Sequence, residues 1–180
     1  MKDEVLEMNV EKIAVLFQTD PTRRKNPNVI KESNIEQIKK RFPHVQVYRA
    51  ETEEELLAQT RDADVLVTWG KYRPVKFCTG AKSLKWIHAL SAGVDGLILE
   101  PDIMNLDIKL TSTKGIHGGP MSDHAMAYIF SFLRMFPTLY KQQQEKIWLK
   151  HTEAEEIVNK TIGIVGMGAI GQDIAKKCKV

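Results

Sequence analysis

A glycine-rich turn near the carboxyl end of the chain constrains its fold more than any other feature. Residues 161–165, Thr-Ile-Gly-Ile-Val, form an apolar, β-branched run that predicts a buried strand. Residues 166–171 follow with the spacing Gly-x-Gly-x-x-Gly, and a helical pattern with one apolar side comes next. A strand, a glycine turn and a helix in this order predict a dinucleotide-binding site. The alternative is a tight strand–turn–helix that binds no ligand.

Each glycine of the turn has its own physical reason. Gly166 allows the chain to leave the strand in a tight turn with positive φ. Gly168 removes a Cβ that would collide with a diphosphate, and Gly171 lets the helix pack close to the strand. The residue that contacts the ribose lies about 20 positions beyond such a turn, which is past Val180, so the spacing does not separate NAD from NADP.

The composition is that of an ordinary globular protein. Of the 180 residues, 43% are apolar and 27% are charged, and the net charge is +3. Because the two signs are well mixed, nothing favours nucleic acid as a partner. No apolar window reaches about eighteen residues, so no membrane span is expected. Cys78 and Cys178 are single and widely separated, which indicates reduced thiols in a cytoplasmic protein and no metal site.

The first part of the chain alternates between strand and helix patterns. Two capping boxes, Ser33-x-x-Glu36 and Thr52-x-x-Glu55, predict the starts of helices. Five short apolar runs predict strands at 12–17, 45–48, 64–68, 84–89 and 108–111. This alternation predicts an α/β domain with a parallel sheet over residues 1–111. Its first turn carries no glycine spacing, so it is distinct from the part of the chain that contains residues 166–171.

The second part, residues 112–180, starts with a long helical pattern from Pro120 to about Gln144. Few charges interrupt residues 124–133, so most of the circumference of this helix is expected to be buried. Pro137 predicts a kink or a break. Asn159 suits a left-handed turn just before the strand at 161–165.

Ligands of α/β sheets bind in the loops that follow the strands, which makes three loops candidates. In the loop 69–74, Lys71, Tyr72 and Arg73 are candidate partners for a carboxylate, and the alternative is a solvated surface loop. The loop 90–96 is rich in small residues, so its backbone N–H groups predict either an anion-binding nest or a tight turn into a helix.

The third loop, 112–119, contains His117, the histidine that is the best candidate to line a site. His88 alternates within a predicted strand and is interpreted as a packed, hydrogen-bonded histidine. The run Ser122-Asp123-His124 is not a catalytic triad, because adjacent residues of a helix point about 100° apart.

Three segments together resemble the D-isomer-specific 2-hydroxyacid dehydrogenase family. They are residues 90–97, 115–125 and 160–171, and their order and spacing fit across residues 12–180. The resemblance implies a flavodoxin-like substrate domain over 1–111, followed by an interdomain helix and the first βα unit of a Rossmann domain over 112–180. It also implies hydride transfer between NAD or NADP and a 2-keto or 2-hydroxy acid, in a cytoplasmic homodimer.

The resemblance also implies roles for individual residues. Backbone amides of Ala92 and Gly93 would hold the substrate carboxylate, for which Lys71 and Tyr72 are the further candidates. The cofactor-binding residues would be Gly166, Gly168, Ala169, Ile170 and Gly171 at the diphosphate and Met121 at the nicotinamide. The family usually has Glu where Asp123 stands.

The catalytic Arg, Glu and His of the family would lie beyond Val180. No catalytic residue is therefore assigned, and this chain alone is predicted to be inactive. The alternative function is a non-catalytic, dinucleotide-sensing regulatory or binding protein.

Overall fold

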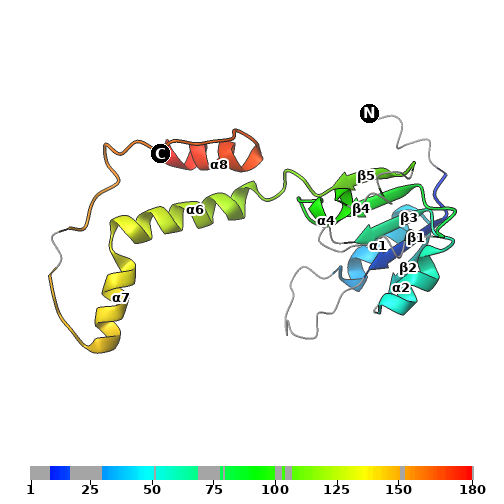
Figure 1. Ribbon diagram of the computed structural model, residues 1–180, viewed down its shortest axis with the longest axis horizontal. Coiled ribbons are helices and arrows are strands. Elements are labelled where there is room, and N and C mark those ends of the chain that lie inside the picture. Colours follow the sequence, from blue (N-terminus) through cyan, green and yellow to red (C-terminus); the bar gives the residue numbers. More distant parts are fainter. Residues whose placement is uncertain are drawn as a thin grey trace. The chain divides into compact units, whose positions relative to one another are not determined.

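The computed structural model describes residues 9–16, 30–50, 52–68, 78, 80–99, 103, 107–150 and 153–179. They fall into two compact units, Met1–Lys114 and Gly115–Val180. The first is built on a β-sheet, and the described part of the second is helical (Figure 1). None of the helices in these described ranges is both long enough and apolar enough to cross a membrane.

The first unit contains a five-stranded parallel sheet with the strand order β2-β1-β3-β4-β5. Its strands are β1 (Lys12–Leu16), β2 (Gln46–Ala50), β3 (Val65–Thr68), β4 (Trp86–Ala89) and β5 (Lys109–Ser112). The order 2-1-3-4-5 is that of flavodoxin-like sheets. The predicted α/β fold with a parallel sheet is therefore confirmed.

The described helices of this unit are α1 (Glu32–Arg41), α2 (Glu53–Thr60) and the short α4 (Asp95–Ile98). The capping box predicted at the start of α2 is confirmed. Oγ1 of Thr52 accepts a hydrogen bond from the N–H of Glu55 at 3.2 Å, and Oε2 of Glu55 accepts one from the N–H of Thr52 at 3.3 Å. Both groups would otherwise lack a partner at the helix start.

The capping box predicted for α1 is wrong. The helix begins at Glu32, before Ser33, and its N-cap is Lys31. The side-chain oxygen of Asn34 accepts a hydrogen bond from the N–H of Lys31 at 2.9 Å. Asn34, the third residue of the helix, thus plays the part that was expected of Glu36. The helix therefore starts two residues earlier than the Ser33 pattern predicts.

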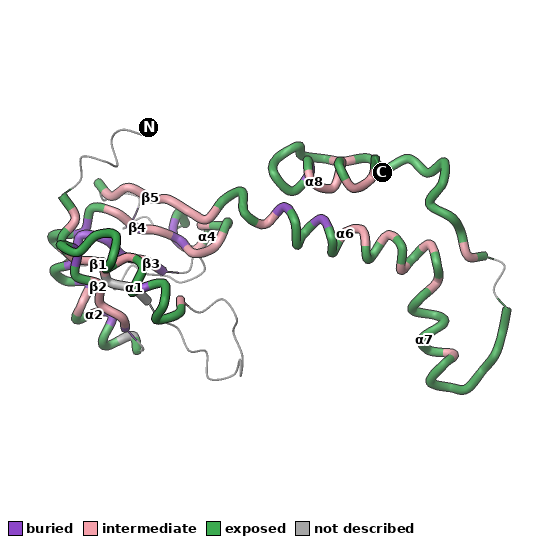
Figure 2. Tube along the Cα trace, turned by 180° about the vertical axis from the view of Figure 1, so that it is seen from behind, coloured by how far each residue is buried: buried purple, intermediate pink, exposed green. Residues whose placement is uncertain are grey.

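The main hydrophobic cluster of the first unit lies on one face of the sheet. Leu66 of β3 and Ile87 of β4 are completely buried and pack with Leu56 of α2 and Leu97 of α4. Strand β3 is buried on both faces, because helices cover a parallel sheet from two sides. Figure 2 shows buried residues (purple) on the sheet and helices of this unit, with a few more on α6 of the second unit. A rigid sheet of this kind holds the loops at the ends of its strands in place.

The carboxylate of Asp64, just before β3, joins the amino ends of three strands. It accepts hydrogen bonds from the backbone N–H groups of Glu11 at 2.9 Å and Lys12 at 3.0 Å, and from Nζ of Lys85 at 2.8 Å. Its side chain is 11% exposed. Burial raises the pKa of Asp64, but the hydrogen bonds from Lys85 and from the two backbone groups outweigh burial and leave the pKa below its usual value.

The second unit contains α6 (Gly118–Leu133), α7 (Phe136–Glu145) and α8 (Ala169–Cys178). The predicted break near Pro137 is confirmed, since Pro137 lies in the first turn of α7 and Met135 before it has a φ of 56°. Asn159 has a φ of 62°, so the predicted left-handed turn is confirmed as well.

The strand predicted over residues 161–165 is not formed. A strand exists only beside a neighbour that completes its hydrogen-bond ladder. Among residues 115–150 and 153–179, which are those described in this unit, there is no second strand. The predicted burial is wrong as well, because residues 161–165 are exposed apart from the half-buried Ile164.

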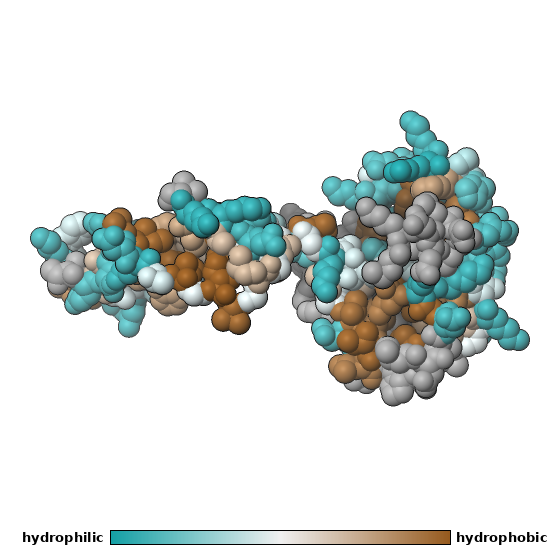
Figure 3. Space-filling model, turned by 90° about the horizontal axis from the view of Figure 1, so that it is seen from above, coloured by the Kyte–Doolittle hydropathy of each residue, from teal (hydrophilic) through white to brown (hydrophobic). Residues whose placement is uncertain are grey.

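The expectation that most of α6 is buried is also wrong. Gly118 and Ser122 are its buried residues, whereas Tyr128, Phe130 and Phe132 are 52%, 42% and 70% exposed. Figure 3 shows apolar side chains (brown) on the surface of this unit. A helix with apolar residues on most sides needs neighbours on several sides. In the described part of the unit, α8 is the element that lies along it (Figure 1).

Candidate functional site

The glycine turn before α8 has the backbone conformation that its sequence predicts. Gly166 has a φ of 96°, in the region that favours glycine. Gly168 is the N-cap of α8 and has an extended backbone, with φ −72° and ψ −170°. Nε2 of the Gln172 side chain donates a hydrogen bond to the backbone oxygen of Met167 at 3.0 Å, which ties the turn to the first part of the helix.

Gly168 and Gly171 are glycines for different reasons. A Cβ on Gly171 would overlap the backbone oxygen of Gly166 and lie 3.1 Å from its carbonyl carbon, so this glycine is required by packing, as predicted. A Cβ on Gly168 would meet nothing within 4 Å. Its φ and ψ suit any residue. Neither a positive φ nor close packing within the chain therefore requires a glycine at position 168.

The amino end of α8 is open to an anion. No side chain caps it, and the first N–H groups of a helix have no partners within the helix. Ala169 and Ile170 carry two of these groups, and the helix dipole adds partial positive charge beside them. With free space at Gly168, this end of the helix fits a diphosphate pressed against bare backbone.

Helix α6 runs beside α8 in the same direction, so the amino ends of both helices lie together (Figure 1). Gly118 at the start of α6 lies against Asp173 and Ala169 of α8, and Met126 lies near Cys178 at the other end. Met121, predicted to line a nicotinamide pocket, is 47% exposed in the first turns of α6. It stays a candidate for contact with a ligand held at the start of α8.

The loop after β4 is a tight turn into α4. The hydroxyl of Ser91 donates a hydrogen bond to the backbone oxygen of Gly93 at 2.7 Å, and α4 begins at Asp95. Ala92 and Gly93 are exposed, and within the described part of the chain their N–H groups have no partner. No residue of this loop has positive φ, so the alternating right- and left-handed form of a nest is absent from it.

The other two substrate candidates, Lys71 and Tyr72, lie outside the described residues, as does Arg73. Their role as partners of a carboxylate stays a prediction from the sequence.

His88 is half-buried and hydrogen-bonded, as predicted. Its Nδ1 lies 2.8 Å from Oγ1 of Thr111, and Nε1 of Trp86 donates to the same hydroxyl oxygen at 2.7 Å. Burial lowers the pKa of His88, so the neutral imidazole is favoured. These hydrogen bonds connect the side chains of β4 to β5, so His88 has a structural role.

The residues of the apparent triad have three separate partners. The hydroxyl of Ser122 donates to the backbone oxygen of Gly119 at 2.8 Å, Asp123 pairs with Lys177, and the ring of His124 stacks edge-on against Tyr128. The prediction that they form no relay is confirmed. His117 is the N-cap residue of α6, and its side chain makes no capping hydrogen bond.

Sequence reasoning missed the contacts that join α6 to α8. The sequence pattern places Asp173 and Lys177 on the side of their helix opposite the apolar residues, yet both side chains contact α6. Their i, i+4 spacing places them on one face, which was the available signal. The hydroxyl of Thr111 was missed for a similar reason, because its partners lie on another strand.

Comparison with known proteins gives a consistent result. Residues 126–180 match the family model for the NAD binding domain of D-isomer specific 2-hydroxyacid dehydrogenases. The chain is 28% identical over 160 residues to a D-3-phosphoglycerate dehydrogenase of Archaeoglobus fulgidus, covering 83% of this chain and 29% of the relative. It is 30% identical over 162 residues to a glyoxylate reductase of Pyrococcus furiosus, covering 83% and 48%. The chain thus spans less than half the length of either relative.

A solved structure agrees with this. The crystal structure of a D-isomer specific 2-hydroxyacid dehydrogenase family protein from Aeromonas salmonicida matches with a TM-score of 0.76 and 26% identity, over 94% of this chain and 50% of that one. Fold and site together define an α/β protein with a flavodoxin-like sheet and the glycine turn of a dinucleotide-binding domain. The family model, the curated relatives and the solved structure all place the similarity of this chain in the D-isomer-specific 2-hydroxyacid dehydrogenase family.

Proposed function

We propose that this chain is part of an NAD(P)-dependent oxidoreductase that transfers a hydride between a nicotinamide cofactor and a 2-keto or 2-hydroxy acid. The observation that carries this is Gly168, whose missing side chain leaves open space that the chain's own packing does not need. The similarity to the D-isomer-specific 2-hydroxyacid dehydrogenase family supports the reaction class. In this proposal residues 1–111 form the substrate domain and residues 112–180 begin the Rossmann domain.

The residues of the chain are proposed to bind and to orient. The N–H groups of Ala169 and Ile170, with Gly166, Gly168 and Gly171 around them, hold the diphosphate, because a helix amino end attracts negative charge. Met121 contacts the nicotinamide from α6, and its exposed side chain supports this. The bound cofactor supplies the hydride chemistry. NAD and NADP both remain candidates.

The substrate is proposed to be bound through its carboxylate. The N–H groups of Ala92 and Gly93, in the loop after β4, have no partner among the described residues and support this role, since they can donate to a carboxylate oxygen. Lys71 and Tyr72 are proposed as its further partners. No residue of this chain is assigned the proton transfer.

The test is a binding and turnover measurement on the protein in its full natural length. NADH and NADPH are titrated by nucleotide fluorescence, and glyoxylate, hydroxypyruvate and a phosphorylated 2-keto acid are then offered as substrates. We expect binding of at least one nucleotide and reduction of at least one acid. Failure to bind either nucleotide contradicts the proposal. Binding without turnover favours the regulatory alternative.

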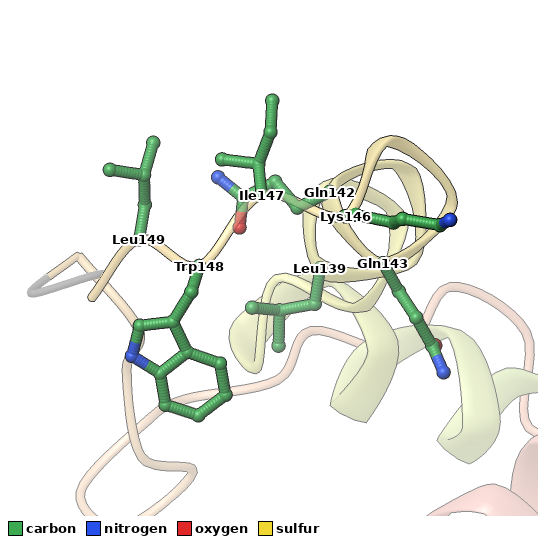
Figure 4. A pocket seen from close by; sticks show the side chains of 7 residues that line it. All are labelled: Leu139, Gln142, Gln143, Lys146, Ile147, Trp148 and Leu149. Atoms are coloured by element: carbon green, nitrogen blue, oxygen red, sulfur yellow. The ribbon is translucent and has the colours of Figure 1, made fainter.

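We further propose a cytoplasmic homodimer that uses the surface around α7 and residues 147–149. Ile147, Trp148 and Leu149 are 45%, 96% and 61% exposed, and with Leu139 of α7 they line a groove of about 520 Å³. In Figure 4, the side chain of Trp148 points to the same side of residues 147–149 as Leu139 of α7, and the side chains of Ile147 and Leu149 point to the other side. Exposed apolar patches of this kind mark protein interfaces. The free thiols of Cys78 and Cys178 support a reducing compartment.

Charge supports a second copy as the partner of this surface. Lysines at 141, 146 and 150 lie around the apolar run, with Glu145 among them paired with Lys141; glutamates at 153, 155 and 156 follow it, and Glu155 pairs with Lys160. A twofold axis through such a segment places the basic residues of one copy opposite the acidic residues of the other. The pattern is therefore self-complementary.

Replacing Trp148 with glutamate is expected to convert the dimer into a monomer, because a charge would then be buried in an apolar interface. The measurement is molar mass by light scattering on the protein in its full natural length. The matched control is Phe42→Glu, which changes an exposed aromatic residue of the other unit and should leave the mass unchanged. A wild-type monomer, or a dimer that survives Trp148→Glu, contradicts this interface.

A further inference from the structure

Helices α6 and α8 contact each other at three levels along their length. At the amino ends, Asp173 lies against Gly118. One turn further along α8, Nζ of Lys177 pairs with Oδ1 of Asp123 and lies 3.3 Å from the backbone oxygen of Gly119. At the far end, Sγ of Cys178 lies 3.6 Å from Sδ of Met126. These contacts can form together only when the two helices are parallel and in this register.

The first level is the closest approach. A Cβ on Gly118 would overlap Oδ2 of Asp173 and lie 3.0 Å from its Cγ and 3.2 Å from the backbone oxygen of Ala169. Gly118 is buried although it lies in a helix that is mostly exposed. The carboxylate of Asp173 therefore occupies the volume that any other residue at position 118 would fill.

Charge favours the same position. Helix α6 has no acidic residue in its first turn, and His117 makes no side-chain cap. Its amino end carries partial positive charge, and the carboxylate of Asp173 lies beside it. On the solvent side, Lys176 pairs with Asp173 at 3.1 Å, but 75% of the lysine side chain is exposed. That ion pair is weak, because water screens it.

We infer that Asp173 is a positioning residue, whose carboxylate holds the start of α6 in register with the glycine turn of α8. The inference rests on the proposed function and deepens it. The turn and the first N–H groups of α8 hold the diphosphate, whereas Met121 on α6 meets the nicotinamide. Asp173 sets the spacing between these two contacts and touches neither end of the cofactor.

This separation of roles makes a specific prediction about two ligands. ADP-ribose contains the diphosphate but lacks the nicotinamide, so its binding depends on α8 and not on the position of α6. NADH needs both helices. Loss of the carboxylate should therefore weaken NADH and spare ADP-ribose, whereas a general loss of stability would weaken both.

The experiment compares the two affinities in the protein in its full natural length by calorimetry. For Asp173→Asn we expect the Kd of NADH to rise by about threefold to tenfold, the range for a charge at a helix end, and the Kd of ADP-ribose to stay within about twofold of wild type. Gly118→Ala is the second variant and should show the same selective loss, since its new methyl group displaces the carboxylate. Lys176→Ala is the matched control and should change neither Kd by more than about twofold.

The outcomes separate this inference from the proposed function. If the wild-type protein binds neither ligand, the dinucleotide site itself is wrong. If it binds both, and Asp173→Asn leaves the NADH affinity unchanged or weakens both ligands by the same factor, Asp173 has no positioning role and the proposed function still stands.

Discussion

Replacing Gly168 with valine is expected to weaken binding of NADH or NADPH by at least about a hundredfold, or ~2.7 kcal/mol, with little change in protein stability. The new side chain enters the space in front of the first turn of α8, where nothing lies within 4 Å. It would keep a diphosphate away from the N–H groups of Ala169 and Ile170. Valine adopts the extended backbone of this position, so the free energy of unfolding should change by less than about 1 kcal/mol.

Gly171→Val is the matched comparison, because this substitution should lower protein stability strongly, whereas Gly168→Val should hardly change it. A side chain there overlaps the backbone of Gly166, which cannot move as a flexible side chain would. We expect a loss of about 2 kcal/mol or more in stability. Nucleotide titration and thermal unfolding of both variants check the pair. A Gly168→Val protein that binds dinucleotide like wild type would show that the turn has no ligand and would remove the main support for the proposed reaction.

Replacing Asp64 with alanine is expected to lower the free energy of unfolding by about 2–3 kcal/mol. The change leaves the backbone N–H groups of Glu11 and Lys12 without this acceptor and removes one of the two partners of Lys85, the other being the backbone oxygen of Asn9. All three groups lie at the amino ends of strands, so the sheet loses the carboxylate that joins them. Urea unfolding at neutral pH measures the loss. The matched control is Asp62→Ala, since Asp62 pairs with Lys12 at the surface with 63% of its side chain exposed and should matter little.

The same carboxylate predicts the direction of a pH effect. The pKa of Asp64 is lowered in the folded protein, so its stabilising contribution is complete above the unfolded pKa, which is about 4 for aspartate. It is lost as the pH falls through the lowered pKa of the folded state. Between about pH 5 and pH 2 the wild type should therefore lose stability more steeply than Asp64→Asn, which has no charge to lose. Equal slopes in acid unfolding would contradict the assigned hydrogen bonds.

Patterns that lie within a few residues could be predicted from the sequence. The capping box of Thr52 and Glu55, the positive φ of Gly166 and the break before Pro137 all depend on neighbours along the chain. The observed order of the five strands agrees with the flavodoxin-like domain that the family resemblance implies. The error at Ser33 is also local, because the side chain of Asn34 accepts a hydrogen bond from the N–H of Lys31 and the helix starts there instead.

Pairing between distant residues could not be predicted. Residues 161–165 have the composition of a strand, but a strand needs a neighbour, and none lies among the described residues of that unit. The apolar pattern of α6 predicted burial, but only the arrangement of the second unit shows which of its faces is covered. A hydrophobic pattern indicates that one face of a helix or strand should be buried, but it does not identify the residues that pack against that face.

The sequence by itself determined the class of protein, an α/β chain with a dinucleotide turn, because glycine spacing and strand–helix alternation are local properties of the backbone. Only the tertiary structure decided how the parts of the candidate site are held. In the sheet, Asp64 accepts a hydrogen bond from Lys85. Beside the glycine turn, Lys177 of α8 pairs with Asp123 of α6, 54 positions earlier in the sequence. The physical reason is that hydrogen bonds and ion pairs act over a few ångströms in space, and folding alone determines which distant residues come that close.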